Sequence, residues 1–509
     1  MPTLFTNATF VTLEGERRCA AMAVENGRIA ALGSEAELAP FLDRGFTRQD
    51  LGNGFVLPGF HDSHSHMILT GIMSLGLNLS QVTSMAELQD RIRDAAKGLP
   101  KGEFVRGFLL EDLNLRDGRP PLRADLDAAA PDHPVLIIHP TCHRCFLNTA
   151  GLKTLAVPLD LAGLDLERGE PTGIIRDPGI LTFIFPAMLR SMERSHLDAA
   201  VAEAARMALA AGITTVQSME GGELTPGCSP VLLANAPRLP LRVVCWNQSM
   251  DIAEVQTLGL PRVGGCICAD GELDARTAAL FEPYCNDPEN DGTLLYSQET
   301  MDGFVEKAHC LGLQLTVHCE SERAIEQVLR ALEKALRKHP RTDHRHRIEH
   351  FELPTWDQCG RLARAGIIAS MQPAFLPEFI GGERLAHTLE LFGPHRVRRL
   401  HPYRFILDAG VRVCGGSDSP VTPYNPLEGI RAAASHPFPE QAVSVREALE
   451  MFTTQAAFSV FQEADKGTLA QGKLADFTVL DRDLLALAPE QVCEAKVRQV
   501  FVDGEQRFG

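Results

Sequence analysis

The chain has 509 residues, 45% of them hydrophobic, which is enough to bury a large core in several domains or in one decorated barrel. Its formal net charge of −17 favours solubility and opposes nucleic acid or an anionic membrane surface as a partner. The sequence lacks an uninterrupted apolar stretch of about 18 residues and a signal-like N-terminus, and its 13 cysteines form no compact framework, so we expect a cytoplasmic protein with reduced thiols.

Both ends of the chain predict short β-strands. The apolar runs are residues 21–24, 28–32, 473–480 and 497–504. The first two flank an Asn-Gly turn, which is the strongest short-range signal of a hairpin. We therefore expect residues 1–54 and 465–509 to pair into one small composite β-sandwich domain.

A polar run with two histidines, GFHDSHSH at 59–66, follows directly on the apolar residues 55–58. Residues two apart on a strand face the same way, about 6–7 Å apart along it, so Asp62, His64 and His66 point together if this segment is extended. Two imidazoles placed in this way can converge on one metal ion, and a carboxylate behind them can orient a ring nitrogen. The segment therefore predicts part of a metal site at the end of a buried strand.

Short apolar runs alternate with helical patterns through the middle of the chain. The candidate strands are residues 134–139, 213–216, 313–318, 366–371 and 411–414. Residues 322–339 place apolar side chains such as Ile325 and Leu329 at helical spacing. Strands that alternate with helices over roughly 400 residues favour a parallel α/β architecture, most simply a (β/α)8 TIM-like barrel with insertions, to which we assign residues 55–464.

Four more polar residues lie at or just past the ends of candidate strands, where barrel active sites are built. They are His143, His318, His350 and Asp418. Imidazole and carboxylate suit zinc and similar divalent ions, which lower the pKa of a bound water toward about 7, so that a nearby carboxylate can take its proton. A single histidine at a strand end is more often a structural residue, and Asp418 suits a turn equally well. Their joint occurrence in this order favours a metal site.

Two closely spaced cysteine pairs, Cys142 with Cys145 and Cys266 with Cys268, invite a zinc interpretation. Neither has a second pair at the spacing of a zinc ribbon. Structural zinc is therefore not predicted at either pair.

Nine segments spread over nearly the whole chain form an ordered set of motifs. They are residues 57–66, 126–135, 146–150, 171–175, 211–217, 346–350, 370–373, 416–421 and 472–476. In this order they resemble the amidohydrolase superfamily and, within it, the amidohydrolase 3 (YtcJ-like) family. The resemblance implies a (β/α)8 barrel with a β-sandwich built from both termini, and metal-dependent hydrolysis, usually of an amide or another C–N bond.

The resemblance also implies roles for the candidate residues. The metal ligands would be His64, His66, His318, His350 and Asp418. Asp418 would also act as general base toward the attacking water, and His143 would contact the substrate carbonyl or its oxyanion. The cofactor would be a divalent metal, with zinc favoured over iron or manganese, and either one or two ions would bind.

The chain departs from the family pattern at three positions. Where many members carry a carboxylated lysine that bridges two metals, this chain has Cys266; its thiolate could ligate zinc, but a buried inert cysteine is the favoured interpretation. Asp177 stands where a glutamate often follows the Pro-Thr-Gly segment, so we include it among the metal ligands and leave a bridging role open. Ser321 and Glu322 replace a Gly-Asp pair after His318, and Glu322 could simply favour the start of a helix.

The leading hypothesis is a hydrolase in which a metal-activated water attacks an amide or related C–N substrate other than a peptide bond. Deamination of a cyclic amidine is the closest alternative. A metal-binding regulator or scaffold without turnover would also explain the missing lysine and the changed segment after His318. The expected partner is a small amide-type substrate, with no nucleic acid, since basic runs are absent, and with a homodimer as the commonest closed assembly.

Overall fold

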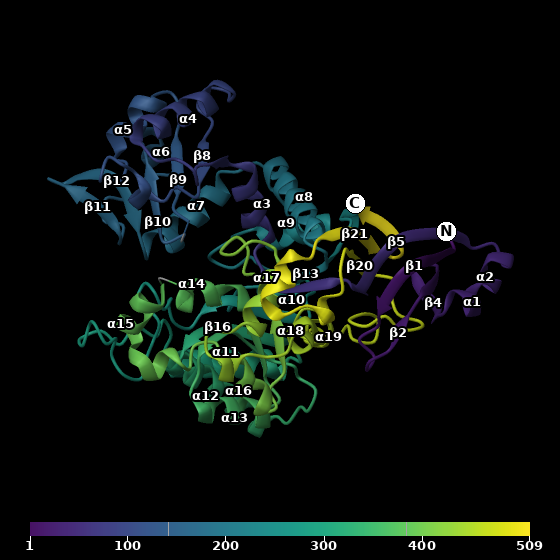
Figure 1. Ribbon diagram of the computed structural model, residues 1–509. Coiled ribbons are helices and arrows are strands. Elements are labelled where there is room, and N and C mark those ends of the chain that lie inside the picture. Colours follow the sequence, from purple (N-terminus) through teal and green to yellow (C-terminus); the bar gives the residue numbers. More distant parts are fainter. Residues whose placement is uncertain (141, 383) are drawn as a thin grey trace. The chain divides into compact units, whose positions relative to one another are not determined.

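The computed structural model describes residues 1–140, 142–382 and 384–509 (Figure 1). It divides into two compact units, each with its own sheets and its own hydrophobic core. The first unit contains residues 1–65, 205–219 and 236–509. The second contains residues 66–204 and 220–235.

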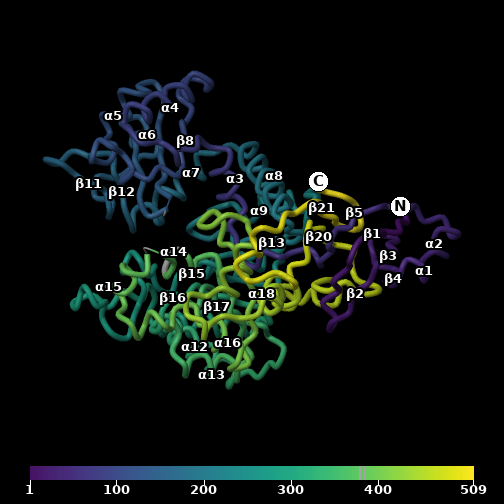
Figure 2. The backbone as a smooth tube through the Cα atoms, viewed as in Figure 1, coloured from purple at the N-terminus to yellow at the C-terminus, as the bar shows by residue number. Residues whose placement is uncertain are grey.

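Both ends of the chain meet in one eight-stranded sheet of the first unit. Its strands are β1 (Thr3–Val11), β2 (Arg18–Cys19), β3 (Ala21–Glu25), β4 (Arg28–Gly33), β5 (Thr47–Pro58), β20 (Phe477–Leu480), β21 (Val497–Val502) and β22 (Glu505–Phe508). The predicted hairpin is confirmed, because β3 and β4 pair antiparallel around Asn26 and Gly27, whose φ angles are 53° and 74°. β20 pairs antiparallel with β5, so the yellow C-terminal strands of Figure 2 extend the purple N-terminal ones.

Phenylalanine side chains pack at the centre of this terminal sheet. Phe5 of β1 lies edge-on to Phe477 of β20 and Phe501 of β21, with ring centroids 5.1 and 5.2 Å away, and the latter two rings stack at 4.4 Å. All three rings are buried. Since such aromatic pairs remove a large apolar area from water, packing as well as hydrogen bonding joins strands from opposite ends of the chain.

The other sheet of the first unit is a barrel-like parallel sheet whose neighbouring strands follow one another in chain order. They are β6 (Phe60–Ser65), β13 (Ile213–Glu220), β14 (Arg242–Asn247), β15 (Arg262–Cys268), β16 (Gln314–Ser321), β17 (Arg347–Leu353), β18 (Ile368–Met371) and β19 (Val413–Gly415). A parallel bridge between Ser65 and Ser419 joins the two ends of this row and closes the sheet. Every residue of β6, β16 and β17 is buried, as expected of parallel strands that are covered on both faces.

Helices alternate with the later barrel strands and lie outside them in Figure 1. The helices of this unit are α1 (Glu35–Leu38), α2 (Pro40–Asp43), α10 (Ile252–Thr257), α11 (Gln298–Cys310), α12 (Glu322–Lys338), α13 (Trp356–Ala365), α14 (Leu376–Ile380), α15 (Arg384–Val397), α16 (Tyr403–Asp408), α17 (Pro426–Ala434), α18 (Val445–Met451) and α19 (Thr454–Phe458). α12 confirms the helix predicted over 322–339, and Ile325 and Leu329 lie on its buried face. Arg337 and Lys338 end it, where positive charge is favourable to the helix dipole.

A six-stranded sheet forms the centre of the second unit. Its strands are β7 (Leu77–Asn78), β8 (Val105–Phe108), β9 (Val135–Ile138), β10 (Arg144–Leu147), β11 (Leu164–Glu167) and β12 (Glu170–Arg176). The helices of this unit are α3 (Met67–Leu75), α4 (Met85–Lys97), α5 (Arg123–Ala129), α6 (Thr149–Thr154), α7 (Phe185–Arg190) and α9 (Cys228–Asn235), and α8 (Arg194–Ala210) runs from this unit into the first. Leu88 of α4 and Leu126 of α5 pack with Ile137 of β9 in its core.

The predicted fold class is confirmed, since the first unit combines a parallel barrel-like sheet with a sheet formed by both termini. One strand lies elsewhere than expected: the run at 134–139 forms β9 in the sheet of the second unit and not a barrel strand. A short apolar run has the same periodicity in either sheet, so its pattern could not assign it. The boundaries of 1–54, 55–464 and 465–509 stay predictions.

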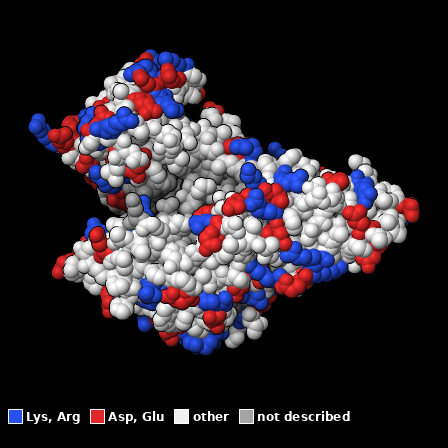
Figure 3. All heavy atoms as spheres, in the orientation of Figure 1, with Lys and Arg blue, Asp and Glu red and all other residues white. Residues whose placement is uncertain are grey.

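The exterior of the protein carries charges of both signs. Acidic and basic side chains intermix over the face drawn in Figure 3. Among the described residues, no helix is both long and apolar enough to cross a membrane.

A buried lysine lies where the barrel meets the terminal sheet. Lys466 is 5% exposed, and its Nζ donates to Thr215 Oγ1 of β13 at 3.0 Å. Arg242 of β14 forms ion pairs with Asp476 and Asp503, both at 2.6 Å. Burial lowers the pKa of Lys466 to about 8, and the positive charge of Arg242 adds to this while Asp476 opposes it.

This lowered pKa predicts a stability that increases with pH. Between about pH 8 and about pH 10.5 the unfolded chain holds the Lys466 proton more tightly than the folded chain, so the free energy of unfolding should rise by on the order of 2 kcal/mol across this window. Urea unfolding of the wild type and of Lys466→Met over this range measures the effect. The rise should be smaller in the variant, and parallel curves would contradict the assignment.

Candidate metal centre

β6 brings the first of the predicted residues to the C-terminal end of the barrel. Asp62 and His64 lie on this strand and are buried, and His66 is the residue directly after Ser65, where α3 begins. Among the described residues, the Asp62 carboxylate bonds to backbone groups and to no imidazole. Its carboxylate accepts hydrogen bonds from the backbone N–H groups of His64 and Ser417, each at 3.1 Å, and so fixes the strand end against the loop after β19.

Glu349 is the carboxylate that orients a histidine ring. His64 Nδ1 lies 2.7 Å from Glu349 Oε2, and both side chains are fully buried. Arg347, on the same strand β17, forms an ion pair with Glu349 at 2.7 Å. Nδ1–H can donate to this carboxylate, and Nε2 then offers its lone pair to a metal once it has lost its own proton.

Asp418 approaches the other nitrogen of His64. Its Oδ1 lies 3.2 Å from His64 Nε2, and its backbone N–H donates to the His64 carbonyl at 2.7 Å. The loop comes this close because Gly416 has no side chain, since a Cβ there would lie 2.5 Å from the backbone nitrogen of His64. Gly416 therefore permits the close approach of this loop to β6.

His318 of β16 and His350 of β17 lie beside His64. Ring centroids are 4.4 Å apart for His318 and His350, and 5.0 Å apart for His64 and His350. His318 Nε2 lies 3.3 Å from the carbonyl oxygen of Gly271, a contact that fixes one nitrogen and leaves the other available. Both ring nitrogens of His350 are buried, and the Cys266 thiol is the one hydrogen-bonding side chain that the described residues place against this ring.

The donor atoms fall into two overlapping groups, within each of which all atoms lie within 4.8 Å of one another. The first consists of His64, His66, Cys266 and Asp418, and the second of Cys266, His318 and His350. Buried imidazole nitrogens without partners are costly unless something binds them. Nitrogen, sulfur and oxygen donors around one point are typical of zinc and similar divalent ions. The residues therefore fit a divalent metal.

The electrostatics of the group favour positive charge at this point. Burial opposes protonation of His64, but the carboxylate of Asp418 and the thiol of Cys266 hold the pKa of His64 well above its usual range. Burial likewise disfavours the Glu349 carboxylate, but Arg347 and His64 hold the pKa of Glu349 at about 2. Glu349 is therefore ionised at neutral pH and can accept a hydrogen bond from Nδ1–H of His64.

His143 and Asp177 belong to the second unit and bond to one another there. His143 Nδ1 pairs with an Asp177 carboxylate oxygen, and both side chains are about 30% exposed. This arrangement holds the His143 ring through one nitrogen. The expectations that His143 contacts the substrate carbonyl and that Asp177 ligates a metal stay predictions.

Two residues of this centre, Arg347 and Glu349, entered the sequence prediction only as part of a motif, and a third, Cys266, was expected to be buried and inert although zinc ligation by its thiolate stayed open. Arg347 and Glu349 are two apart on one strand, so alternation predicts that they share a face. At His350 alternation fails, because its φ of 70° interrupts the extended backbone. Cys266 is only partly buried, and its Sγ lies 3.5 Å from His64 Nε2.

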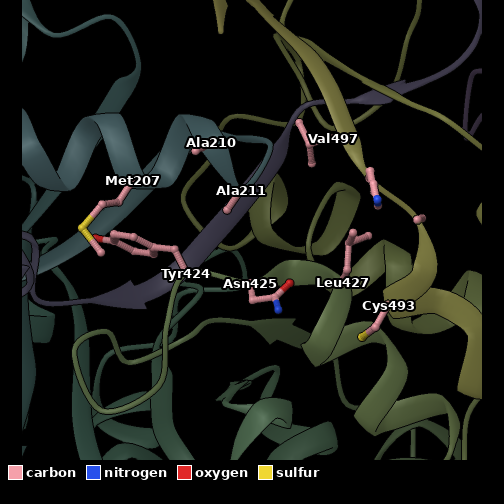
Figure 4. A pocket seen from close by; sticks show the side chains of 10 residues that line it. Met207, Ala210, Ala211, Tyr424, Asn425, Leu427, Cys493 and Val497 are labelled. Atoms are coloured by element: carbon pink, nitrogen blue, oxygen red, sulfur yellow. The ribbon is translucent and has the colours of Figure 1, made fainter. Parts of the chain in front are cut away.

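Two other features are weaker candidates. In the second unit Glu111, Asp112 and His139 lie close together, but Arg144 already forms an ion pair with Asp112. A hollow of about 440 Å³ in the first unit, shown in Figure 4, is lined by residues such as Met207, Tyr424 and Cys493. None of the grouped donor residues is in its lining. The histidine-rich group at the barrel end is therefore the stronger candidate.

Comparisons with known proteins identify the family and the fold of the chain. Residues 48–508 match the family model described as "Amidohydrolase family". The chain is 30% identical to the "Putative amidohydrolase YtcJ" of Bacillus subtilis (strain 168) over 97% of both chains, and 28% identical to the "N-substituted formamide deformylase" of Arthrobacter pascens over 99% of this chain and 97% of that protein. A solved structure of an uncharacterized metal-dependent hydrolase from Pyrococcus furiosus is 26% identical, with a TM-score of 0.80 and coverage of 95% of this chain and 100% of that one.

The buried ion pair behind His64 leads to a stability prediction. Arg347→Met leaves the Glu349 carboxylate buried without its cation, so the free energy of unfolding should fall by about 3–5 kcal/mol. Arg398→Met is the matched control, because Arg398 pairs with Glu440 where both side chains are more than half exposed, and its loss should cost at most about 1 kcal/mol. Urea unfolding measures both, and equal losses would contradict the assignment.

Proposed function

Since the chain belongs to the amidohydrolase family, we propose that it hydrolyses an amide or a related C–N bond other than a peptide bond at a divalent metal centre. The convergence of imidazole, thiol and carboxylate donors around His64 Nε2 carries this proposal. The family and the solved relative from Pyrococcus furiosus support metal dependence. The similarity to a protein named N-substituted formamide deformylase supports N-substituted formamides as the first substrate class to test.

The proposed metal ligands are five residues of the two donor groups: His64, His66, His318, His350 and Asp418. When bound, a divalent ion would polarise the substrate carbonyl and lower the pKa of a water molecule. Nitrogen and oxygen donors of this kind suit zinc. Glu349 contributes indirectly, because it keeps the proton of His64 on Nδ1 and so keeps Nε2 available.

Asp418 is the proposed proton carrier of the reaction. Its carboxylate would accept a proton from the attacking water, whose oxygen bonds to the carbonyl carbon, and would return that proton to the departing amine nitrogen as the C–N bond breaks. Two contacts hold it for this role, the backbone hydrogen bond to the His64 carbonyl and the approach of Oδ1 to His64 Nε2. Because Asp418 is 6% exposed, bulk water has little access to compete for the proton.

The test is a substitution of this carboxylate. Asp418→Asn should lower kcat by about 10²–10⁴-fold, because an amide cannot carry the proton. Amine release from N-substituted formamides and N-acyl amines by the zinc-loaded full chain measures turnover, and elemental analysis measures bound metal. Asp408→Asn is the control, because Asp408 is exposed on α16. Among the described residues, its carboxylate forms an ion pair only with Arg404.

The outcomes separate this proposal from its alternatives. Unchanged turnover in Asp418→Asn would overturn the role of the carboxylate. Release of ammonia from cyclic amidines, with no cleavage of any amide, would indicate a deaminase. Tight metal binding without turnover on any of these compounds would indicate a metal-binding regulator or scaffold.

A further inference from the structure

β15 carries an irregularity at the position of Cys266. In its pairing with β16, Gly265 faces Val317 while Cys268 faces His318, so β15 advances three residues where β16 advances one. Two extra residues, Cys266 and Ile267, therefore form a bulge. Bulges near active sites turn a side chain away from the direction that strand alternation would give it.

Two glycines make this bulge possible. Gly264 and Gly265 have φ angles of 109° and 122°, a conformation that other residues rarely adopt. A Cβ on Gly264 would lie 1.8 Å from the backbone oxygen of Thr316, so a side chain there would push β15 away from β16. The glycines thus allow β15 to stay close to β16 while the next residue turns toward the histidines.

The Cys266 thiol is the one donor that belongs to both groups of candidate ligands. Its Sγ lies 3.5 Å from His64 Nε2 and within 4.8 Å of donor atoms of Asp418 on one side and of His318 and His350 on the other. The rings of His64 and His350 lie 5.0 Å apart, so the two groups are neighbours. A sulfur between them can contact an ion in either group.

We propose that the Cys266 thiolate is a bridging ligand that joins two metal positions, one formed with His64 and Asp418 and the other with His318 and His350. This inference rests on the proposed function only in that a divalent metal occupies the site. The thiol loses its proton to solvent when a metal binds, and no electron is transferred. A sulfur ligand would favour soft or borderline ions such as zinc over magnesium or calcium.

Cobalt titration of the full chain, after removal of metal by a chelator, tests the bridge without reference to turnover. Wild type should bind two Co²⁺ ions, develop a thiolate-to-cobalt charge-transfer band in the near ultraviolet, and show magnetic coupling between the ions by electron paramagnetic resonance. Cys266→Ser should lose the band and the coupling.

Cys268→Ser is the matched control for this substitution. Cys268 lies two residues further along the same strand, its Sγ contacts the carbonyl oxygen of Cys266 at 3.6 Å, and it belongs to neither donor group. The control should keep the band and the coupling of the wild type.

Several results would overturn the bridge. A band that persists in Cys266→Ser would assign the thiolate to another cysteine, and a wild type that binds cobalt without the band would exclude thiolate ligation. A band with a single ion, or with two uncoupled ions, would make Cys266 a ligand of one metal only. Absence of all metal binding would overturn the proposed function as well, whereas a coupled pair without hydrolysis would overturn only the proposed function.

A labelling experiment covers the case in which Cys266→Ser does not fold. In the wild type, bound zinc should protect one additional thiol from alkylation, and peptide mapping should place that thiol at Cys266. Equal labelling of Cys266 with and without zinc would overturn the proposal.

Discussion

The buried ion pair between Arg347 and Glu349 is the interaction on which the interior of the barrel depends. The guanidinium of Arg347 also donates to the carbonyl of Ser63 and to the hydroxyl of Ser370, both at 2.8 Å, so one side chain joins β6, β17 and β18. A fully buried charge is tolerated only where partners replace its water. Because these partners come from three strands, the register of the strands and the orientation of His64 are set together.

This arrangement brings the donor atoms close together and makes positive charge favourable between them. Asp418 and Cys266 flank Nε2 of His64 and favour positive charge there, while Glu349 fixes the opposite side of the ring. A proton can supply this positive charge by binding the imidazole. A divalent ion can supply it by binding several donor atoms at once. Metal and proton therefore compete for the same atoms, and the metal gains from each additional donor that the barrel supplies.

Much of this organisation could be predicted from the sequence, because it depends on local signals. The Asn-Gly turn predicted the β3–β4 hairpin, and helical spacing predicted α12. The separate sheet of the second unit could not be predicted, since the apolar run of β9 has the same pattern as a barrel strand. The carboxylate that orients His64 could not be predicted for a similar reason: Asp62 is near His64 in sequence, whereas Glu349 of β17 reaches the His64 ring only when the barrel closes.

Cys266 shows why the identity of a residue alone does not predict where its side chain points. By resemblance to the family, Cys266 occupies the position of a lysine that bridges two metals in many members. Because cysteine is usually buried and inert, the sequence favoured that interpretation here. Its actual direction follows from the bulge that Gly264 and Gly265 permit, and a strand without those two extra residues would place the thiol according to simple alternation. The donor set of the centre is thus determined by the backbone geometry of β15 as much as by the side chains that the chain carries there.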